Sequence, residues 1–545
     1  MAWLILLAFI LTPFLTHYIT TFLFRRQSKN RSPPRKPPTI PYWVPGLYHA
    51  LGLLSKPSTY FALLIKKYGA HAPFTVKIGR VSYLVVRSSE HCRSLLRQSS
   101  STKAKSNLTE IYDKVFGTTR DAIRYYQINE SVDQDSGPFH PLLASVHSKY
   151  QDDVEFKSLT DTFISIFRRN MSNKMFQPSS WTQIEDLWSF LEIEITRGAV
   201  ETLFGSALIK NQPKLVRDYW DFQSKTGEFI PGLPRFTISS AVPPRDRLLE
   251  GIRKWLQTTH GGTDFAQIKA SDPVWDEKRG SKFIQECDAT FAQIPSFNYQ
   301  ARASECLRII HNISSAAMPS TFWHIVEILR NQALTDYLSR EVLRHAQPTQ
   351  DKYDLAAITK LPNLQSLSLE IKRIRTATYM LRTSATPDAH LDNNWVIPNR
   401  TSVLAFSQDI GLNTALWSKA RPQITTRPLA EFWSDRFLIP DKSASTKRYR
   451  KGRDSVTTGT FSLDGIETLH EILSGGIGDE CCSDLEIRLA DVFTAAAVAV
   501  LLAEFEMNLC DGDDVEAGLP PVGEVAYGVL KPLEKVAVRL KLRSG

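Results

Sequence analysis

Near the C-terminal end of the chain, residues Ser474 to Phe493 read SGGIGDECCSDLEIRLADVF. Three glycines and two adjacent cysteines stand immediately before a segment whose apolar spacing predicts a helix. The chain has only six cysteines among 545 residues, and no two of them form a CxxC pair. A disulfide framework or a structural zinc site is therefore not predicted, which suits a domain that faces the reducing cytosol.

The start of a helix favours a negatively charged sulfur. The helix dipole and the exposed N–H groups of the first turn stabilise a thiolate there. Ser483 and Glu486 have the spacing of a capping box, which predicts that the helix begins directly after Cys482. Without further motifs, two buried structural thiols or a strained vicinal disulfide would be the simpler interpretation of Cys481 and Cys482.

Two upstream motifs change that interpretation. In LPNLQSLSLEIKRIR, residues 361–375, Glu370 and Arg373 are three apart and share one face of a predicted helix. EFWSDRFL, residues 431–438, follows, and the cysteine loop comes next. This order resembles the cytochrome P-450 family of haem-thiolate enzymes, with Glu370 to Arg373 as its ExxR motif and Arg436 as the arginine of its PERF motif. The resemblance implies a buried ion network behind the haem, in which a third charge offsets the desolvation of the other two.

The family's cysteine loop, FxxGxxxCxG, assigns the iron ligand. With Cys482 as the ligand, Gly476 and Gly478 take the two glycine positions of the loop, and Asp491 takes the later acidic position. With Cys481 as the ligand, the second glycine and the acid are both lost. The resemblance therefore implies that Cys482 is the axial ligand of a haem b iron.

Several positions depart from the family pattern. The phenylalanine of the loop is Gly475, the glycine after the ligand is Asp484, and the basic residue two positions before the ligand is Glu480. An acid there would repel a haem propionate. Arg382, in LRTSA, matches an arginine that usually holds a propionate. Weaker haem binding than in a standard member is expected, and a degenerate, non-catalytic member of the family stays an alternative.

The stretch NISSAAMPSTFWHIVEILR, residues 312–330, resembles the family's oxygen-activating helix. Ala316 and Ala317 replace the polar pair that relays protons in most members. Pro319 is predicted to kink this helix. Weak candidates to replace the missing hydroxyl are Ser314, Ser315, Ser320 and Thr321, although an ordinary helix position is the simpler interpretation of each alone.

The N-terminal segment predicts a membrane anchor. Ala2 to Phe24 carries no fixed charge and would be about 35 Å long as a helix, which is enough for a hydrocarbon core of about 30 Å. The basic run RRQSKNR follows at once and predicts a cytosolic body, as in single-pass proteins of the endoplasmic reticulum. We expect a transmembrane helix over 1–24, a basic and proline-rich linker over 25–45, and a haem domain over 46–545.

The rest of the chain predicts a mainly α fold. Residues 155–380 are mostly helical in pattern, and β-rich runs occur at 74–86 and 394–406. Together with the resemblance, this implies the cytochrome P-450 fold, a helical haem domain with minor β-sheet. Composition is ordinary, with 42% hydrophobic and 23% charged residues, which excludes disorder on a large scale. The net charge of +9 suits anionic partners such as lipid headgroups, an acidic protein or nucleic acid, but charge alone favours an ordinary solvated surface, and no nucleic-acid partner is predicted.

The resemblance implies a membrane-anchored monooxygenase. Such an enzyme receives electrons from an NADPH-dependent flavin reductase and oxidises a small lipophilic substrate, in fungi commonly in secondary metabolism. The polar and basic segment at 442–455 is predicted to be a surface insertion, and its basic stretch Lys447 to Arg453 is a candidate docking surface for an acidic reductase. An alternative is a haem-thiolate isomerase or dehydratase that needs no reductase, which the missing polar pair at Ala316 and Ala317 favours.

Overall fold

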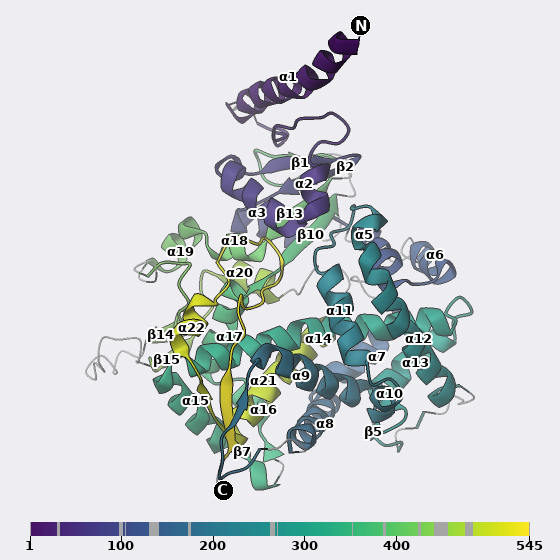
Figure 1. Cartoon of the computed structure of the whole chain (residues 1–545), viewed down its shortest axis with the longest axis vertical. Helices are drawn as coiled ribbons and strands as arrows, with labels where there is room; N and C mark the ends of the chain where they lie inside the picture. Colours follow the sequence, from purple (N-terminus) through teal and green to yellow (C-terminus); the bar gives the residue numbers. More distant parts are fainter. Residues whose placement is uncertain are drawn as a thin grey trace.

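A mostly helical body with small sheets makes up the computed structural model (Figure 1), as the sequence predicts. The structure describes the whole chain except residues 1, 30–32, 98–101, 104, 130–140, 173–175, 262–267, 270, 351, 385–388, 400, 423, 425–426, 441–455, 475–482 and 544–545.

Four long helices pack against one another at the centre of the body. They are α8 (Asp153–Ser172), α9 (Leu187–Phe204), α14 (Tyr299–Leu329) and α21 (Asp484–Glu504). Helices α14 and α21 are apolar around most of their circumference, which is typical of helices that are buried on all sides. The side chain of Asn298 caps α14 by accepting a hydrogen bond from the N–H of Ala301 at 3.0 Å, and Pro319 lies inside this helix.

Further helices cover one side of α14. The longer ones pack directly against it or against each other: α11 (Leu215–Thr226), α12 (Val242–Thr259) and α13 (Lys282–Ala292). Two shorter segments reach the same side, the π-helix η2 (Tyr112–Phe116) and helix α6 (Arg120–Asn129). This side of the central helix is therefore covered by segments that lie far apart in the sequence.

The largest sheet combines strands from the two halves of the chain. Its order is β1-β2-β13-β10-β3, with β1 at Phe74–Ile78, β2 at Val81–Val85, β13 at Ser402–Phe406, β10 at Tyr379–Ser384 and β3 at Thr102–Lys103. The predicted hairpin at 74–86 is confirmed, because β1 and β2 pair antiparallel around Gly79 and Arg80. A second sheet has the order β16-β18-β4, with β16 at Phe505–Leu509, β18 at Val538–Leu542 and β4 at Thr182–Ile184.

Four short helices border the region of the predicted site. They are α7 (Pro141–Gln151), α16 (Leu355–Ile358), α17 (Pro362–Ile374) and α20 (Glu467–Ser474). Helix α17 starts with Pro362 at its first position, where the missing N–H costs nothing. It packs against α14 and α20, so the predicted ExxR residues lie between the central helix and the C-terminal part of the chain.

The N-terminal segment is helix α1 (Ala2–Lys29), which stands at one end of the molecule (Figure 1). Phe24 is buried beside Tyr68, and the N–H of Thr75 donates to the carbonyl of Pro38 at 2.8 Å, so the proline-rich segment lies along β1. In the described part of the chain, no helix combines the length and the apolar character needed to cross a bilayer. The transmembrane span predicted for residues 1–24 is therefore not supported, and His17 and three threonines make its second half more polar.

Candidate functional site

Glu370, Arg373 and Arg436 meet in one buried cluster. Arg373 Nε donates to Glu370 Oε2 at 2.7 Å and Arg436 Nε donates to Glu370 Oε1 at 3.0 Å, while all three side chains are fully buried. The two arginines also bind backbone carbonyls, Arg373 that of Leu429 at 2.7 Å and Arg436 that of Glu431 at 2.8 Å. The cluster thereby fastens the segment at 429–436 to helix α17.

The charges in this cluster depend on one another. Burial alone would raise the pKa of Glu370, but Arg373 and Arg436 outweigh it, so the pKa of this carboxyl lies below its usual value. Burial also lowers the pKa of Arg436, against the attraction of Glu370. The ring of Trp417 lies 5.8 Å from the Arg373 guanidinium and 5.9 Å from that of Arg436. Removing one charged partner from such a buried group typically costs about 3–5 kcal/mol.

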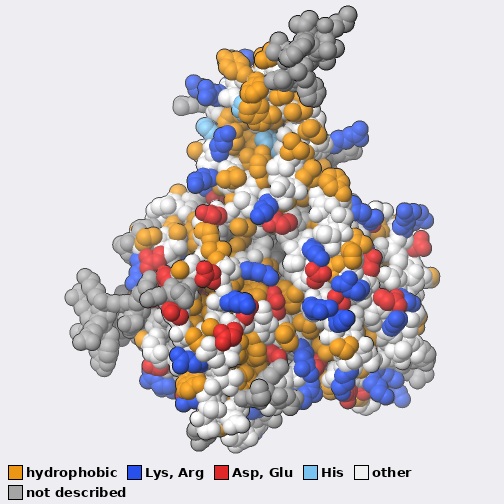
Figure 2. Space-filling model, viewed as in Figure 1, with side chains coloured by type: hydrophobic (Ala, Val, Ile, Leu, Met, Phe, Trp, Pro, Cys, Tyr) orange, Lys and Arg blue, Asp and Glu red, His pale blue; other side chains and the backbone are white. Residues whose placement is uncertain are grey.

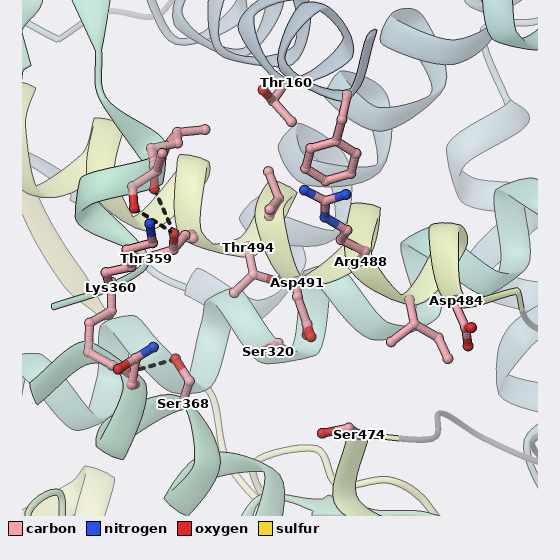
Figure 3. Close-up of a pocket in the computed structure, with 18 of the residues that line it drawn as sticks. Thr160, Ser320, Thr359, Lys360, Ser368, Ser474, Asp484, Arg488, Asp491 and Thr494 are labelled. Carbon is pink, nitrogen blue, oxygen red and sulfur yellow. Dashed lines mark hydrogen bonds between the residues drawn. The ribbon is translucent and has the colours of Figure 1, made fainter. Parts of the chain in front are cut away.

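A hollow of about 1690 Å³ lies beside this cluster and is called the central hollow below. Helices α7, α8, α14, α17, α20 and α21 contribute to its lining. Ser474 and Ser483, the last described residues on either side of the cysteine loop, both line it, and so do Arg382 of β10 and Ser320 of α14. Figure 3 shows Ser320, Ser474 and Asp484 around this hollow. The loop that carries the predicted ligand therefore begins and ends at its wall.

Cys482, Cys481, Gly476 and Gly478 belong to residues 475–482 and lie outside the described residues. The assignment of Cys482 as iron ligand thus stays a prediction from the sequence. The basic stretch at 442–455 also lies outside them.

A capping box starts helix α21, as predicted. The N–H of Glu486 donates to Ser483 Oγ at 3.0 Å, and the N–H of Ser483 donates to Glu486 Oε2 at 3.1 Å. The same carboxylate, which is fully buried, binds two side chains of α14: Arg308 Nη1 at 2.9 Å and Asn312 Nδ2 at 2.8 Å. The residue that follows Cys482 is thereby fixed to the central helix by several charge-assisted hydrogen bonds.

Arg308 also links Glu486 to Glu305 and, through it, to helix α6. Its Nε donates to Glu305 Oε2 at 3.0 Å, and Tyr126 on α6 donates to Glu305 Oε1 at 2.6 Å. Burial raises the pKa of Glu305, and Arg308 opposes that effect. Sequence reasoning missed Arg308 and Glu305. The signal that was available is a pair of opposite charges three residues apart in a helix that is otherwise largely apolar.

Four candidate residues on α14 have different surroundings. Ala316 is exposed although its neighbours on both sides, residues 312–315 and 317–328, are buried. Ala317 is fully buried. Thr321 Oγ1 donates to the carbonyl of Ala317 at 2.8 Å, so its hydroxyl is bound within its own helix. Ser320, one turn after Ala316, lines the central hollow and is the hydroxyl that the fold places next to open space.

These observations fit a bound haem. A flat macrocycle needs an open space beside the central helix, a cysteine loop at its edge and a cation for its propionates. The structure provides the exposed Ala316 between buried neighbours, the two ends of the cysteine loop, and Arg382 at the wall of the central hollow. Small alanine side chains at 316 and 317 leave room where a larger residue would fill it.

The chain was compared with known proteins. It is 24% identical over 522 residues to cytochrome P-450 monooxygenase fsoE of Humicola fuscoatra, with 92% of this chain and 86% of that protein covered. It is 22% identical over 524 residues to cytochrome P-450 monooxygenase efuG of Hormonema carpetanum, with 92% and 89% covered. Over 92% of its length the chain is therefore similar to monooxygenases of the cytochrome P-450 family.

The similarity also extends to animal members of the family. Cytochrome P-450 7A1 of Oryctolagus cuniculus is 20% identical over 521 residues, with 92% of each chain covered. Cholesterol 7-alpha-monooxygenase of Cricetulus griseus is 21% identical over 378 residues, with 66% of each chain covered. No protein-family model matches the chain. These relatives are named as cytochrome P-450 monooxygenases, which are oxidoreductases, and a haem iron is the cofactor that the similarity implies.

Proposed function

We propose that this cytochrome P-450 binds haem b through the Cys482 thiolate and oxidises an unactivated carbon of a lipophilic substrate. The electrons come from NADPH through a flavin reductase. One observation carries the proposal: both ends of the cysteine loop, the guanidinium-bearing Arg382 and the Ser320 side of the central helix line a single hollow. These four features support haem binding, and the requirement for NADPH, reductase and dioxygen distinguishes a monooxygenase from a haem-thiolate isomerase.

Each residue of the site has a distinct role in this proposal. Cys482 is the iron ligand, and Arg382 holds a propionate. Glu370, Arg373 and Arg436 keep the segment before the cysteine loop in place. When bound, the haem-thiolate supplies the reductive cleavage of dioxygen. The protein holds the substrate, excludes water and delivers protons.

The substrate-binding side is expected where helix α14 meets α11 and η2. There the imidazole of His311 is surrounded by aromatic rings, with centroid distances of 5.6 Å to Phe116, 6.2 Å to Tyr219 and 6.0 Å to Phe222. Burial lowers the pKa of His311 to about 4, so it is neutral near pH 7. An aromatic wall with a neutral side chain suits an apolar ligand. The relative named cholesterol 7-alpha-monooxygenase makes a rigid, sterol-sized lipid the first substrate class to test.

We also propose that the N-terminal end attaches the enzyme to a membrane, with the catalytic body in the cytosol. Figure 2 shows apolar side chains gathered at that end of the molecule. They include exposed large residues of α1 and of the segment that follows it: Leu11, Phe14, Leu15, Tyr18, Phe22, Leu23, Trp43, Leu47 and Leu51. Contiguous exposed apolar surface of this kind is typical of contacts with lipid or with another protein.

Two measurements test the proposed function. The reduced protein with carbon monoxide should show the absorption of a thiolate-ligated haem, and product formation should require NADPH, the reductase and dioxygen. A protein that binds no haem would instead be the degenerate member considered above.

The exposed Ala316 and the buried Ala317 favour a second candidate, an isomerase or dehydratase that rearranges a peroxide. Such chemistry needs neither a reductase nor a proton relay from a positioned acid–alcohol pair. Conversion of an organic peroxide with NADPH, reductase and dioxygen all withheld would establish this second function and exclude the first.

A further inference from the structure

A buried histidine on the central helix links two serine residues at the central hollow. His324 Nδ1 lies 2.7 Å from the carbonyl oxygen of Ser320, which can only accept a hydrogen bond, so Nδ1 carries the proton. Nε2 is then the acceptor, and it lies 2.8 Å from the hydroxyl of Ser368 on α17. The hydrogen bonds thereby fix one tautomer of a neutral imidazole.

The hydroxyls of Ser320 and Ser368 lie next to the two ring nitrogens of His324. Ser320 Oγ lies 3.5 Å from His324 Nδ1, which is the longest separation between neighbouring groups in this series. Ser368 Oγ has a choice of two acceptors, His324 Nε2 and the carbonyl of Leu364, which lies at 2.8 Å. A hydroxyl with one proton and two acceptors changes partner by rotation alone.

The three hydrogen-bonded side chains all line the central hollow: Ser320, His324 and Ser368. At one end, Ser320 is one helical turn from the exposed Ala316, about 5–6 Å along the helix face. At the other end, Lys372 of α17 and Asp491 of α21 form an ion pair at 2.8 Å on the rim, where Asp491 is half exposed. Figure 3 shows Ser320, Ser368 and Asp491 around the same hollow.

We propose that Ser320, His324 and Ser368 form a proton relay that replaces the acid–alcohol pair missing at Ala316 and Ala317. The relay rests on the proposed monooxygenase function. It carries protons from water at the rim of the hollow, beside Lys372 and Asp491, to dioxygen held next to Ala316. Ser320 is the group that meets the reacting oxygen, and His324 and Ser368 act through it.

The relay has to supply the protons that each turnover of a monooxygenase consumes. One turnover consumes dioxygen, two electrons from NADPH and two protons; one oxygen atom enters a C–H bond and the other leaves as water. Ser320 gives its hydroxyl proton to oxygen and regains one from His324 Nδ1. His324 Nε2 takes the proton of Ser368, which is restored from water at the rim. The ring returns to its first tautomer by exchange with that water after each transfer, so that the second proton of the turnover follows the same route.

The competing explanation is purely structural: His324 fastens α14 to α17. Both explanations predict that a bulky apolar replacement harms folding. They differ for replacements that keep the helix contact and remove proton exchange. Ser368→Ala removes only the outer hydroxyl, and His324→Gln keeps a hydrogen-bonding side chain that cannot carry a proton from one end to the other.

Thr359 supplies a matched control. Its hydroxyl also lines the central hollow and also donates to a backbone carbonyl four residues earlier, Leu355 at 2.7 Å, as Ser368 does to Leu364. No histidine is bonded to it in the described part of the chain. Thr359→Val therefore removes a hydroxyl of the hollow without touching the relay.

The experiment measures turnover with reductase and NADPH for the wild type and the three variants, together with haem content and the carbon monoxide spectrum. A positioned proton donor typically contributes about 10²–10⁴-fold, so His324→Gln should lower product formation by about 10²-fold, and Ser368→Ala by about 10-fold. Peroxide release should rise and the solvent isotope effect should change, while the carbon monoxide spectrum stays that of the wild type. Thr359→Val should behave as the wild type.

Two outcomes would overturn the relay, and they differ from failure of the proposed function. Unchanged coupling of NADPH to product in both His324→Gln and Ser368→Ala would exclude it. ¹⁵N spectra of the histidine-labelled protein, which need no turnover, should show His324 with the proton on Nδ1 and a change at Nε2 in Ser368→Ala. A protonated ring or the opposite tautomer would also exclude it. A wild type without NADPH-dependent product refutes the monooxygenase function itself.

Discussion

The buried ion group around Arg308 makes a quantitative prediction about stability. Arg308→Met would remove the guanidinium that contacts Glu305 and Glu486 and leave two carboxylates in the interior. Each keeps some donors: Glu305 the hydroxyl of Tyr126, and Glu486 the amide of Asn312 and a backbone N–H. Breaking a buried pair by removing one partner typically costs about 3–5 kcal/mol. Because donors remain, we expect a loss of about 3 kcal/mol in the free energy of unfolding.

A double-variant cycle separates the ion pair from other effects of the substitution. Arg308→Met combined with Glu486→Gln removes both charges and keeps the size of the side chains. The coupling energy should be about 1–3 kcal/mol, so the double variant is more stable than the sum of the single changes predicts.

Urea unfolding followed by tryptophan fluorescence is the assay, with the slope of the transition checked for constancy. The control is Arg344→Met, because Arg344 pairs with Glu341 at 2.5 Å but is 68% exposed, and exposed pairs contribute at most about 1 kcal/mol. A loss below 1 kcal/mol for Arg308→Met, or strictly additive effects in the cycle, would refute the reasoning.

Three further predictions concern stability at other sites and membrane attachment. Glu370→Ala should destabilise the fold by about 3–5 kcal/mol and reduce haem content, because it leaves two arginines buried without their carboxylate; unchanged urea unfolding would contradict this. Burial lowers the pKa of His311 and of His324 from 6.5 to about 4, so the unfolded chain binds more protons between those values. Stability is therefore fully present above about pH 6.5 and falls as the pH drops to about 4, by about 3 kcal/mol for each histidine. Urea unfolding of His324→Gln should lose the contribution of that histidine, about 3 kcal/mol between pH 6.5 and 4, and an identical pH profile would argue against it. Removing residues 1–30 should move the protein from the membrane to the supernatant fraction, and an undiminished membrane fraction would show that another surface binds lipid.

The sequence predicted those features that depend on short-range patterns. The hairpin at 74–86 follows from two β-rich runs around a glycine, and the capping box of Ser483 and Glu486 follows from spacing alone. Glu370 and Arg373 were recognisable because three residues along a helix define a shared face. Arg436 required the order of motifs along the chain, since nothing local indicates that it reaches Glu370.

Other features depend on contacts that no short pattern contains. Glu486 was assigned to a capping box, but its bonds to Arg308 and Asn312 join helices 174–178 residues apart. His324 meets Ser368 only because α17 packs against α14. Ala316 is exposed inside an otherwise buried stretch of helix, and such exposure is a property of the whole fold. The apolar N-terminal run predicted a membrane span, which the described helix does not support.

The carbon monoxide difference spectrum of the reduced protein tests the central claim most directly, measured on the wild type, Cys482→Ser and Cys481→Ser. Ligation of the iron by Cys482 predicts the thiolate-type Soret band in the wild type, its retention in Cys481→Ser and its loss in Cys482→Ser. Loss in Cys481→Ser with retention in Cys482→Ser would move the ligand by one residue. A wild type that shows no thiolate band would contradict the haem-thiolate assignment as a whole.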